Sequence, residues 1–276
     1  MPKTRPLWVV DLSDPRAPPQ EIWDAMTPEE RTEVIDALPS EFDLIEAMPP
    51  EGDGHFVPKI QVRDTVESYF RRTKRPVYLG SELAVYYPGE KVFAPDLIAV
   101  LDVSLHWRDS WVVAVEGKGP DFALEIMYRT RPKKDLEQNR SRYSRLGIPE
   151  YFVFDSRRMR LNGFRLRAGG GYDPILPQSG RFQSAVLGLE LGIEGNRLRF
   201  YHSDAMLPDS AELIARLEGV TSDLWARAEA AEQRAEAETQ RAEAETQRAD
   251  AEALARAEAE RRLAAALARL AELERS

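Results

Sequence analysis

Apolar residues recur along the first 205 positions with spacings that predict a mixed α/β domain. Helical spacing predicts helices at about 28–38, 59–72 and 134–146. Thr27 and Glu30 form a capping box at the start of the first helix, and Gly147 ends the third. Runs with β character predict strands over 77–79, 83–87, 92–103, 111–115, 122–128, 151–154, 161–166 and 198–201. This order predicts one mixed sheet flanked by helices.

From about residue 210 the pattern changes to a long helix. Residues 235–241 and 242–248 are identical seven-residue units, AEAETQR, and no glycine or proline follows Gly219. Two readings stay open: a solvated single helix held by glutamate–arginine pairs, or a coiled coil that makes the protein a homo-oligomer. The chain is therefore divided into an N-terminal extension with a short helix (1–54), a core domain (55–205) and the long helix (210–276).

Composition limits the class of protein without choosing a function. The chain has 276 residues, no cysteine and a formal net charge of −9. The segment 206–276 holds 10 Arg and 16 acidic residues, which leaves the rest nearly neutral at −3. Charge thus neither supports nor excludes a phosphate-bearing substrate. The absence of thiols and of any apolar run of about 20 residues predicts a cytoplasmic protein without a membrane span.

Two acidic residues lie inside apolar β runs. Asp96 lies within the run 92–103, and Glu125 lies within 122–127. Burying an isolated carboxylate is costly, so a cation shared by the two side chains explains the pattern better than chance. A backbone carbonyl beside the second acid, at Ile126, is expected to add a ligand. The alternative is that each acid ends a strand and faces solvent.

Several separated segments around these acids resemble one bacterial family. The matching segments are residues 94–97 (APDL), 120–126 (PDFALEI), 134–135 (KD), Tyr143 and 145–155 (RLGIPEYFVFD). In this order they resemble the Uma-type restriction endonucleases, a branch of the PD-(D/E)XK nuclease superfamily. The resemblance implies a restriction-endonuclease-like fold, Mg²⁺ or Mn²⁺ as cofactor, DNA as substrate, and Asp96 and Glu125 as the metal-binding acids.

The chain departs from that family at one catalytic position. The family usually carries a lysine four residues after the aspartate that matches Asp135, and here that residue is Asn139. Asparagine cannot supply a positive charge. Met127, two residues after Glu125, is not a lysine either. Nearby Lys133, Lys134 or Arg140 could substitute, so the enzyme is expected to be rebuilt, weak or inactive.

A rival pair also fits the superfamily motif. Glu116 and Lys118 form a literal (D/E)XK triplet twenty residues after Asp96. Gly117, Gly119 and a following proline predict a turn at this point. The order of the family segments favours Glu125 over Glu116.

Four further residues are supporting candidates. Glu82 could approach the metal from a preceding strand, and Glu67 could do so from the first long helix. Asp135 and Tyr143 lie eight residues apart on one helical face, where they could orient the site or be structural. The three histidines show no ligand spacing and are expected to be surface or packing residues; they are His55, His106 and His202.

Two functions remain in competition. The first is a Mg²⁺-dependent DNA endonuclease that cleaves with metal-activated water. The second is a catalytically impaired nuclease fold that acts as a binding or assembly module through its long helix. The missing lysine at residues 127 and 139 favours the second reading.

Overall fold

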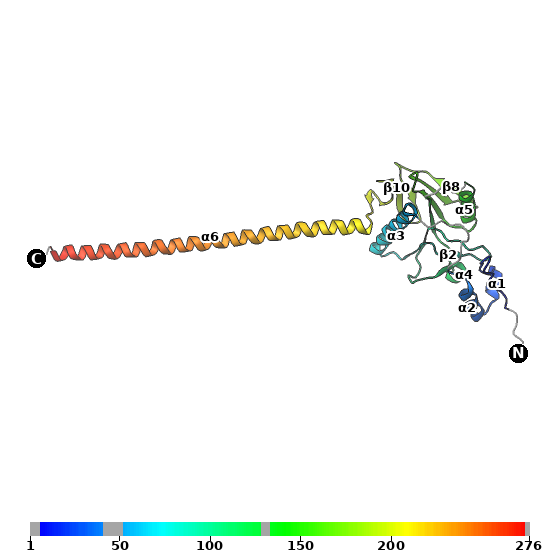
Figure 1. The fold of residues 1–276 in the computed structure, drawn as a ribbon, viewed down its shortest axis with the longest axis horizontal. Coiled ribbons are helices and arrows are strands. Elements are labelled where there is room, and N and C mark those ends of the chain that lie inside the picture. The colour runs from blue at the N-terminus through cyan, green and yellow to red at the C-terminus, as the bar shows by residue number, and fades with distance from the viewer. Residues whose placement is uncertain (1–5, 41–51, 128–132, 274–276) are drawn as a thin grey trace. The chain divides into compact units, whose positions relative to one another are not determined.

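The structure is a computed structural model that describes residues 6–40, 52–127 and 133–273, without the side chains of 133–136, 268 and 270–273. Figure 1 shows its elements. The helices are α1 (Gln20–Ala25), α2 (Pro28–Ala37), α3 (Asp53–Thr73), α4 (Val113–Glu116), α5 (Lys133–Arg145) and α6 (Ser210–Leu273). The strands are β1 (Val77–Gly80), β2 (Ala84–Tyr86), β3 (Leu97–Leu101), β4 (Ser110–Val112), β5 (Phe122–Met127), β6 (Glu150–Asp155), β7 (Arg160–Leu166), β8 (Tyr172–Ile175), β9 (Phe182–Ser184), β10 (Leu189–Glu194), β11 (Arg197–His202) and β12 (Ala205–Met206).

A six-stranded sheet in the order β1-β3-β5-β6-β7-β8 forms the centre of the globular unit. Strands β5 and β6 are parallel, and the chain between them includes α5, whereas the other neighbours are antiparallel. A four-stranded sheet (β12-β11-β10-β9) and a parallel pair (β2-β4) complete the strands. The predicted α/β class with one mixed sheet and flanking helices is confirmed.

The two faces of the large sheet bury different apolar sets, because side chains alternate along each strand. Phe122, Leu124 and Ile126 of β5 pack with the buried face of α3 and with the four-stranded sheet. Ala123 of β5 lies in the opposite cluster, which includes Tyr143 of α5. The two long helices of the globular unit therefore cover opposite faces of the same strands.

The N-terminal segment packs onto the globular unit through a third apolar cluster. Trp23 and Val34 from α1 and α2 are buried there beside Tyr86 of β2. The predicted capping box is present: the Glu30 amide donates to Thr27 Oγ1 at 3.3 Å, and the Thr27 amide donates to the Glu30 carboxylate at 2.9 Å.

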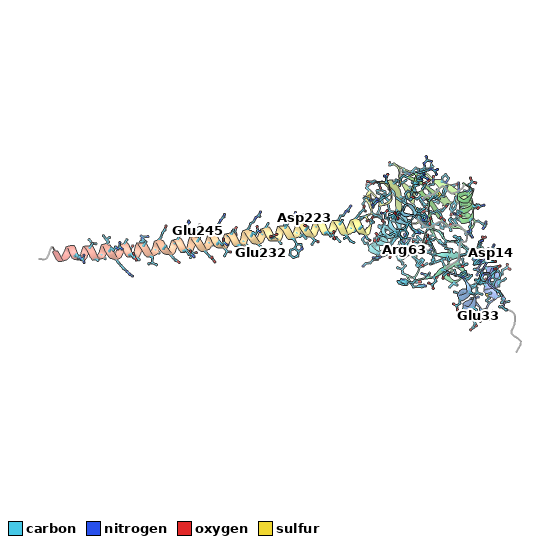
Figure 2. All side chains as sticks on the ribbon, viewed as in Figure 1. Asp14, Glu33, Arg63, Asp223, Glu232 and Glu245 are labelled. Carbon is cyan, nitrogen blue, oxygen red and sulfur yellow. The ribbon has the colours of Figure 1, made fainter. Side chains whose placement is uncertain are left out.

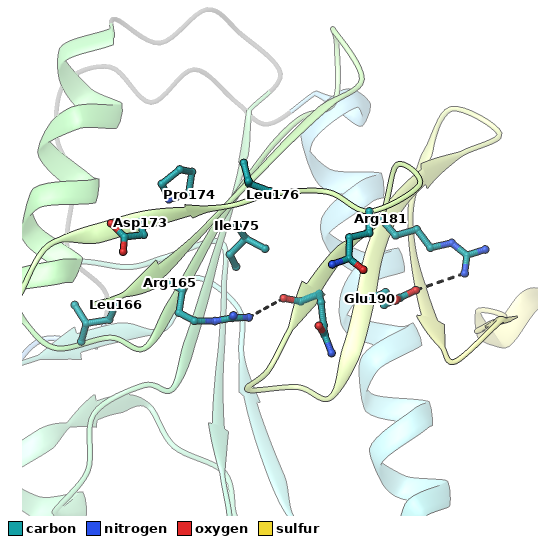
Figure 3. Close-up of a pocket in the computed structure, with 10 residues that line it drawn as sticks. Arg165, Leu166, Asp173, Pro174, Ile175, Leu176, Arg181 and Glu190 are labelled. Carbon is teal, nitrogen blue, oxygen red and sulfur yellow. Dashed lines mark hydrogen bonds and ion pairs between the residues drawn. The ribbon is translucent and has the colours of Figure 1, made fainter. Parts of the chain in front are cut away.

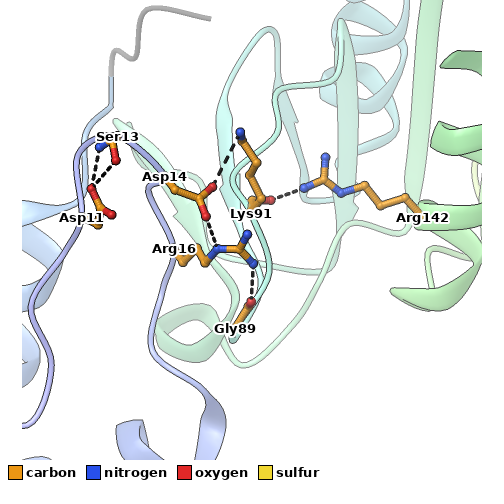
Figure 4. Close-up of polar contacts among 7 residues, drawn as sticks. All are labelled: Asp11, Ser13, Asp14, Arg16, Gly89, Lys91 and Arg142. Carbon is orange, nitrogen blue, oxygen red and sulfur yellow. Dashed lines mark hydrogen bonds and ion pairs between the residues drawn. The ribbon is translucent and has the colours of Figure 1, made fainter.

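Polar contacts add to this attachment (Figure 4). Arg16 Nη1 donates to the Gly89 carbonyl at 3.1 Å, and Asp14 lies 3.6 Å from Lys91 Nζ. Arg142 of α5 donates to the Lys91 carbonyl. The N-terminal segment is thus tied to the loop at residues 88–91, and that loop is tied to α5.

Several predicted elements differ from the structure. Helix α3 begins six residues before the predicted residue 59 and includes Pro58. The predicted strand 92–103 is shortened to Leu97–Leu101, and residues 113–116 form the short helix α4 instead of a strand. Helix α1 and strands β8, β9, β10 and β12 were not predicted, because their short segments carry little periodicity.

Helix α6 forms a separate unit from Glu212 onward. It has 64 residues, which corresponds to about 96 Å at 1.5 Å per residue. Its charged side chains project from the helix, as Asp223, Glu232 and Glu245 do in Figure 2. Within the part of the chain that the structure describes, no helix is both long and apolar enough to cross a membrane.

Candidate nuclease site

Asp96 and Glu125 lie opposite each other at one end of the large sheet. Leu97 of β3 pairs with Leu124 of β5, and Ile98 pairs with Ala123. The same antiparallel register, continued by one residue, sets Asp96 against Glu125. Directly opposed residues point to the same face with Cβ atoms about 4.5–5.5 Å apart. Both residues are 5% exposed, so the two acids are buried.

Each carboxylate is oriented by a hydrogen-bond donor. The Ile126 amide donates to Asp96 Oδ2 at 2.6 Å. The Tyr143 hydroxyl of α5 donates to Glu125 Oε1 at 2.7 Å. Burial, with a further effect from the Glu125 charge, raises the pKa of Tyr143 well above its usual value. The phenol therefore keeps the proton that it donates to Glu125 at neutral pH.

Helix α3 brings two more polar side chains to the same end of the sheet. His55 Nε2 lies 3.1 Å from Asp96 Oδ1. Lys59 Nζ lies 2.5 Å from Glu82 Oε1, and the Lys59 side chain is 6% exposed. His55 and Lys59 are four residues apart, so they share one face of α3. That face continues through Val62 and Val66 into the core.

The sequence reasoning missed both residues. The predicted helix began at Lys59, which left His55 in a loop as a surface or packing residue. The structure instead places His55 within α3, where its Nε2 lies 3.1 Å from Asp96 Oδ1. A signal was present in the sequence. The buried positions Val62 and Val66, extended backward at helical spacing, reach Lys59 and His55.

A proline and a serine hydroxyl fix the start of α3 at the site. Pro58 has no amide hydrogen for the Gly54 carbonyl, its partner in a regular α-helix. Ser156 Oγ donates to that carbonyl at 2.6 Å. The Ser156 amide donates to the Met127 carbonyl at the end of β5, at 2.8 Å. One residue thus ties the first turn of α3 to the strand that carries Glu125.

Glu82 lies just beyond β1 and contacts the segment that precedes β3. The ladder between these strands ends where Gly80 pairs with Ile98. The Glu82 amide donates to the Pro95 carbonyl at 3.0 Å. Its φ of 50° is in the left-handed region, which is uncommon for a residue other than glycine. The side chain is half exposed and pairs with Lys59.

The other predicted supporting residues fall at different places. Asn139 is half buried on α5, one turn before Tyr143. The structure does not bring Glu67 to the site: it is on the exposed part of α3, where it pairs with Arg71 at 2.9 Å. Lys134 and Asp135 belong to α5, but their side chains lie outside the described residues.

The rival pair lies at the opposite end of β3. Lys118 Nζ donates to the Leu101 carbonyl at 2.8 Å and lies 2.7 Å from Asp121. Glu116 is held by the Arg108 guanidinium at 2.6 and 3.0 Å. Leu101 is five residues from Asp96, or about 16 Å along a strand. Glu116 and Lys118 are thus held by local contacts, and the structure does not bring them to Asp96.

The two carboxylates suit a hard divalent cation. Among the described residues, no group of three or more His, Asp or Glu side chains converges as a ready metal site. Mg²⁺ does not need such a cage, because it is typically held by one or two carboxylates together with waters and substrate phosphate. Asp96 and Glu125 are two carboxylates of this kind, and the Ile126 amide donates to an oxygen of Asp96.

A pocket lies elsewhere on the globular unit and is not part of this site. It measures about 350 Å³ between β7, β8 and the four-stranded sheet (Figure 3). Its lining residues are Arg165, Leu166, Asp173, Pro174, Ile175, Leu176, Gln178, Arg181, Gln183 and Glu190. Beside it, the buried Glu150 carboxylate accepts from Arg165 at 3.0 Å and from Ser184 at 2.5 Å. These contacts join the two sheets.

Comparison with known proteins identifies the family of the chain. No curated protein matches the chain. A solved structure described as a "putative nuclease belonging to DUF820 from Anabaena variabilis ATCC 29413" is 14% identical, with a TM-score of 0.38, and the match covers 49% of this chain and 76% of that one. A family model described as "Putative restriction endonuclease" matches residues 27–199, which is more than half of the chain. The protein therefore belongs to the Uma2 family of nucleases.

Proposed function

We propose that the protein is a divalent-metal-dependent DNA endonuclease, with Mg²⁺ or Mn²⁺ held by Asp96 and Glu125. The observation that carries the proposal is the register of β3 and β5, which, continued by one residue, sets these two buried acids against each other. Burial of two adjacent carboxylates is unfavourable unless a cation or hydrogen bonds compensate. Membership of the Uma2 family supports DNA as the substrate.

Neighbouring groups of the protein orient the two carboxylates. A bound Mg²⁺ would polarise the phosphoryl oxygen and lower the pKa of a water that attacks phosphorus. The Ile126 amide and the Tyr143 hydroxyl hold one oxygen each of Asp96 and Glu125. The carbonyl of Ile126 remains the proposed additional ligand. His55 acts on Asp96 and is a positioning residue.

Lys59 is the proposed source of the positive charge that Asn139 cannot provide. Its ammonium is a cation with three N–H donors, and it lies 2.5 Å from the Glu82 carboxylate. It reaches this end of the sheet from α3, on the face opposite to α5. A preorganised cation beside the developing phosphate charge contributes about 10²–10³ in rate.

Nicking of supercoiled plasmid by the purified full-length protein tests the proposal. We expect nicking with added Mg²⁺ or Mn²⁺, none with EDTA, and loss with Asp96→Asn or Glu125→Gln. Glu67→Gln is the matched control, because Glu67 is an exposed acid on α3. Lys59→Met should lower kcat by about 10²-fold or more. Lys91→Met, at an exposed lysine, should have no effect.

Some outcomes would reject the assignment. Nicking that persists in EDTA, or that survives both acid variants, excludes metal held by this pair. If Lys59→Met nicks plasmid at the full rate, Lys59 has no role in catalysis, but the proposed metal site at Asp96 and Glu125 is not affected by that result. Thermal unfolding of each variant separates loss of chemistry from loss of fold.

A second role, assembly through α6, is favoured by a separate observation. Large apolar side chains stand exposed along this helix, among them Trp225 at 72%, Leu224 at 59% and Leu263 at 62%. Exposed apolar side chains at repeated positions of a helix are typical of a surface that pairs with another helix. We propose homo-oligomerisation through α6, whether or not the domain cleaves DNA.

A further inference from the structure

Helix α6 carries a continuous seam at coiled-coil spacing. Through the AEAETQR units and the alanine that follows them, small residues recur at alternating intervals of four and three; they are Ala235, Thr239, Ala242, Thr246 and Ala249. This interval keeps residues on one side of a helix that supercoils with a partner. All five side chains are exposed in the single chain. The small residues allow two helices to approach closely at this point.

The same interval continues toward both ends and reaches large apolar residues. Counting back from Ala235 gives Glu232, Ala228 and Trp225. Counting forward from Ala249 gives Ala253, Arg256, Glu260, Leu263 and Leu267. Trp225, Leu263 and Leu267 are 72%, 62% and 57% exposed. The seam is thus apolar at both ends, small in the middle, and interrupted by three charged residues.

The three charges decide how a second copy can lie. In a parallel, in-register pair each seam residue meets itself, so Glu232 meets Glu232, Arg256 meets Arg256 and Glu260 meets Glu260. Like charges that are desolvated together oppose association. In an antiparallel pair the arginine can instead meet a carboxylate of the partner. Figure 2 shows Glu232 projecting from α6.

We infer that α6 pairs with α6 of a second copy of this chain in an antiparallel coiled coil. The register that sets Glu232 against Arg256 also sets Trp225 against Leu263 and Ala235 against Ala253. By symmetry each of these pairs occurs twice. Trp225 and Leu263 then meet each other, and the seam arginine meets an opposite charge, whereas Leu267 meets Thr221 and Glu260 meets Ala228.

Intrahelical contacts are compatible with this register. Arg256 lies 3.5 Å from Glu260 on its own helix, with both side chains exposed. A guanidinium has five N–H donors and can hold Glu260 and a partner carboxylate together. Acidic residues such as Glu238 and Glu245 flank the seam, and they do so whether the two helices are parallel or antiparallel. Arginines three or four residues away on the same helix offset them.

Cysteine cross-linking distinguishes the two orientations, since the chain has no cysteine of its own. Full-length Ala235→Cys and Ala253→Cys proteins, with tags of different mass, are co-expressed and mildly oxidised. The antiparallel register predicts a mixed disulfide between the two variants and little disulfide in either variant alone. Disulfides within each single variant, without the mixed species, would show a parallel pair and overturn the inference. A monomer by light scattering overturns it too.

Charge exchange tests the register itself. Glu232→Arg and Arg256→Glu should each weaken the dimer about tenfold or more, and the double variant should restore it. Arg248→Glu, outside the seam, is the matched control and should have little effect. Helicity by circular dichroism monitors the helix in every variant. Failure of the double variant to recover affinity while its helicity is intact rules out the Glu232–Arg256 pairing.

Because this inference deepens the assembly role proposed for α6, it does not depend on nuclease chemistry. Plasmid nicking measured on the same variants reports on the globular domain. Loss of dimer with nicking unchanged concerns α6 alone. A stable dimer without nicking contradicts the endonuclease proposal and leaves the coiled coil intact.

Discussion

Removal of the Ser156 hydroxyl should loosen the first turn of α3 from the sheet. The hydroxyl donates to the Gly54 carbonyl at 2.6 Å, and Pro58 cannot replace it. In Ser156→Ala the carbonyl has no amide from its own helix. Changing Pro58 to alanine supplies that amide, so the two substitutions should be coupled.

The expected size follows from burial. Ser156 is 6% exposed and Gly54 is half buried. Leaving a buried acceptor without a donor costs about 1–3 kcal/mol. Partial access of water to Gly54 puts the loss of unfolding free energy near the lower end, about 1–1.5 kcal/mol. Pro58→Ala should cost about 0.4–1 kcal/mol through the unfolded state. In that background, Ser156→Ala should cost about 1 kcal/mol less.

Urea unfolding measured through tryptophan fluorescence gives these free energies. Trp111 is fully buried and reports on the globular unit, whereas Trp107 and Trp225 are exposed and change little. The matched control is Ser144→Ala, because Ser144 bonds the Ser141 carbonyl within α5. Its effect should be independent of Pro58.

Equal costs of Ser156→Ala with proline and with alanine at position 58 would refute the reasoning. They would mean that the Gly54 carbonyl does not depend on the serine. A loss of plasmid nicking that exceeds the loss of folded protein is expected as well, because the first turns of α3 carry His55 and Lys59.

Four further predictions concern the site and the core. Tyr143→Phe should lower metal-dependent nicking about tenfold, because Glu125 loses an orienting donor. A nicking rate that equals that of the unchanged protein at every metal concentration contradicts this. Because the pKa of Tyr143 is raised in the folded protein, the unfolded protein releases this proton near pH 10 while the folded protein retains it. Tm should therefore fall as the pH rises above about 10, and it should fall less in Tyr143→Phe. Glu116→Gln should reduce Tm and leave nicking intact, whereas lost nicking would restore the rival pair. Gly163→Ala should destabilise by about 1–3 kcal/mol in urea, because its Cβ would lie 2.5 Å from Phe152 Cε1; a neutral result would show that the ring can move.

The central sheet and the acid pair could be predicted because their signals are local. Asp96 and Glu125 are isolated acids in apolar runs, and such runs form buried strands. The capping box at Thr27 was equally readable and is present. The role of the pair in binding metal stays a prediction.

Other parts of the fold depend on contacts between distant segments. Val113 and Val115 favour a strand by propensity, yet they form α4, whose Glu116 is held by Arg108. The start of α3 was misplaced because Pro58 usually marks a boundary, and the compensating hydroxyl comes from Ser156, about a hundred residues away. Such a partner leaves no trace in local spacing.

Helices on opposite faces of one sheet both reach the carboxylate pair, and this has a consequence for engineering. The positions of the acids depend on strand register, whereas Tyr143, which contacts Glu125, lies on α5, and Lys59, the proposed source of positive charge, lies on α3. The positive side chain can therefore be moved from one helix to the other without changing how the strands pair. The substitutions Asn139→Lys and Lys59→Met, made together, would place that positive charge on α5 instead of α3.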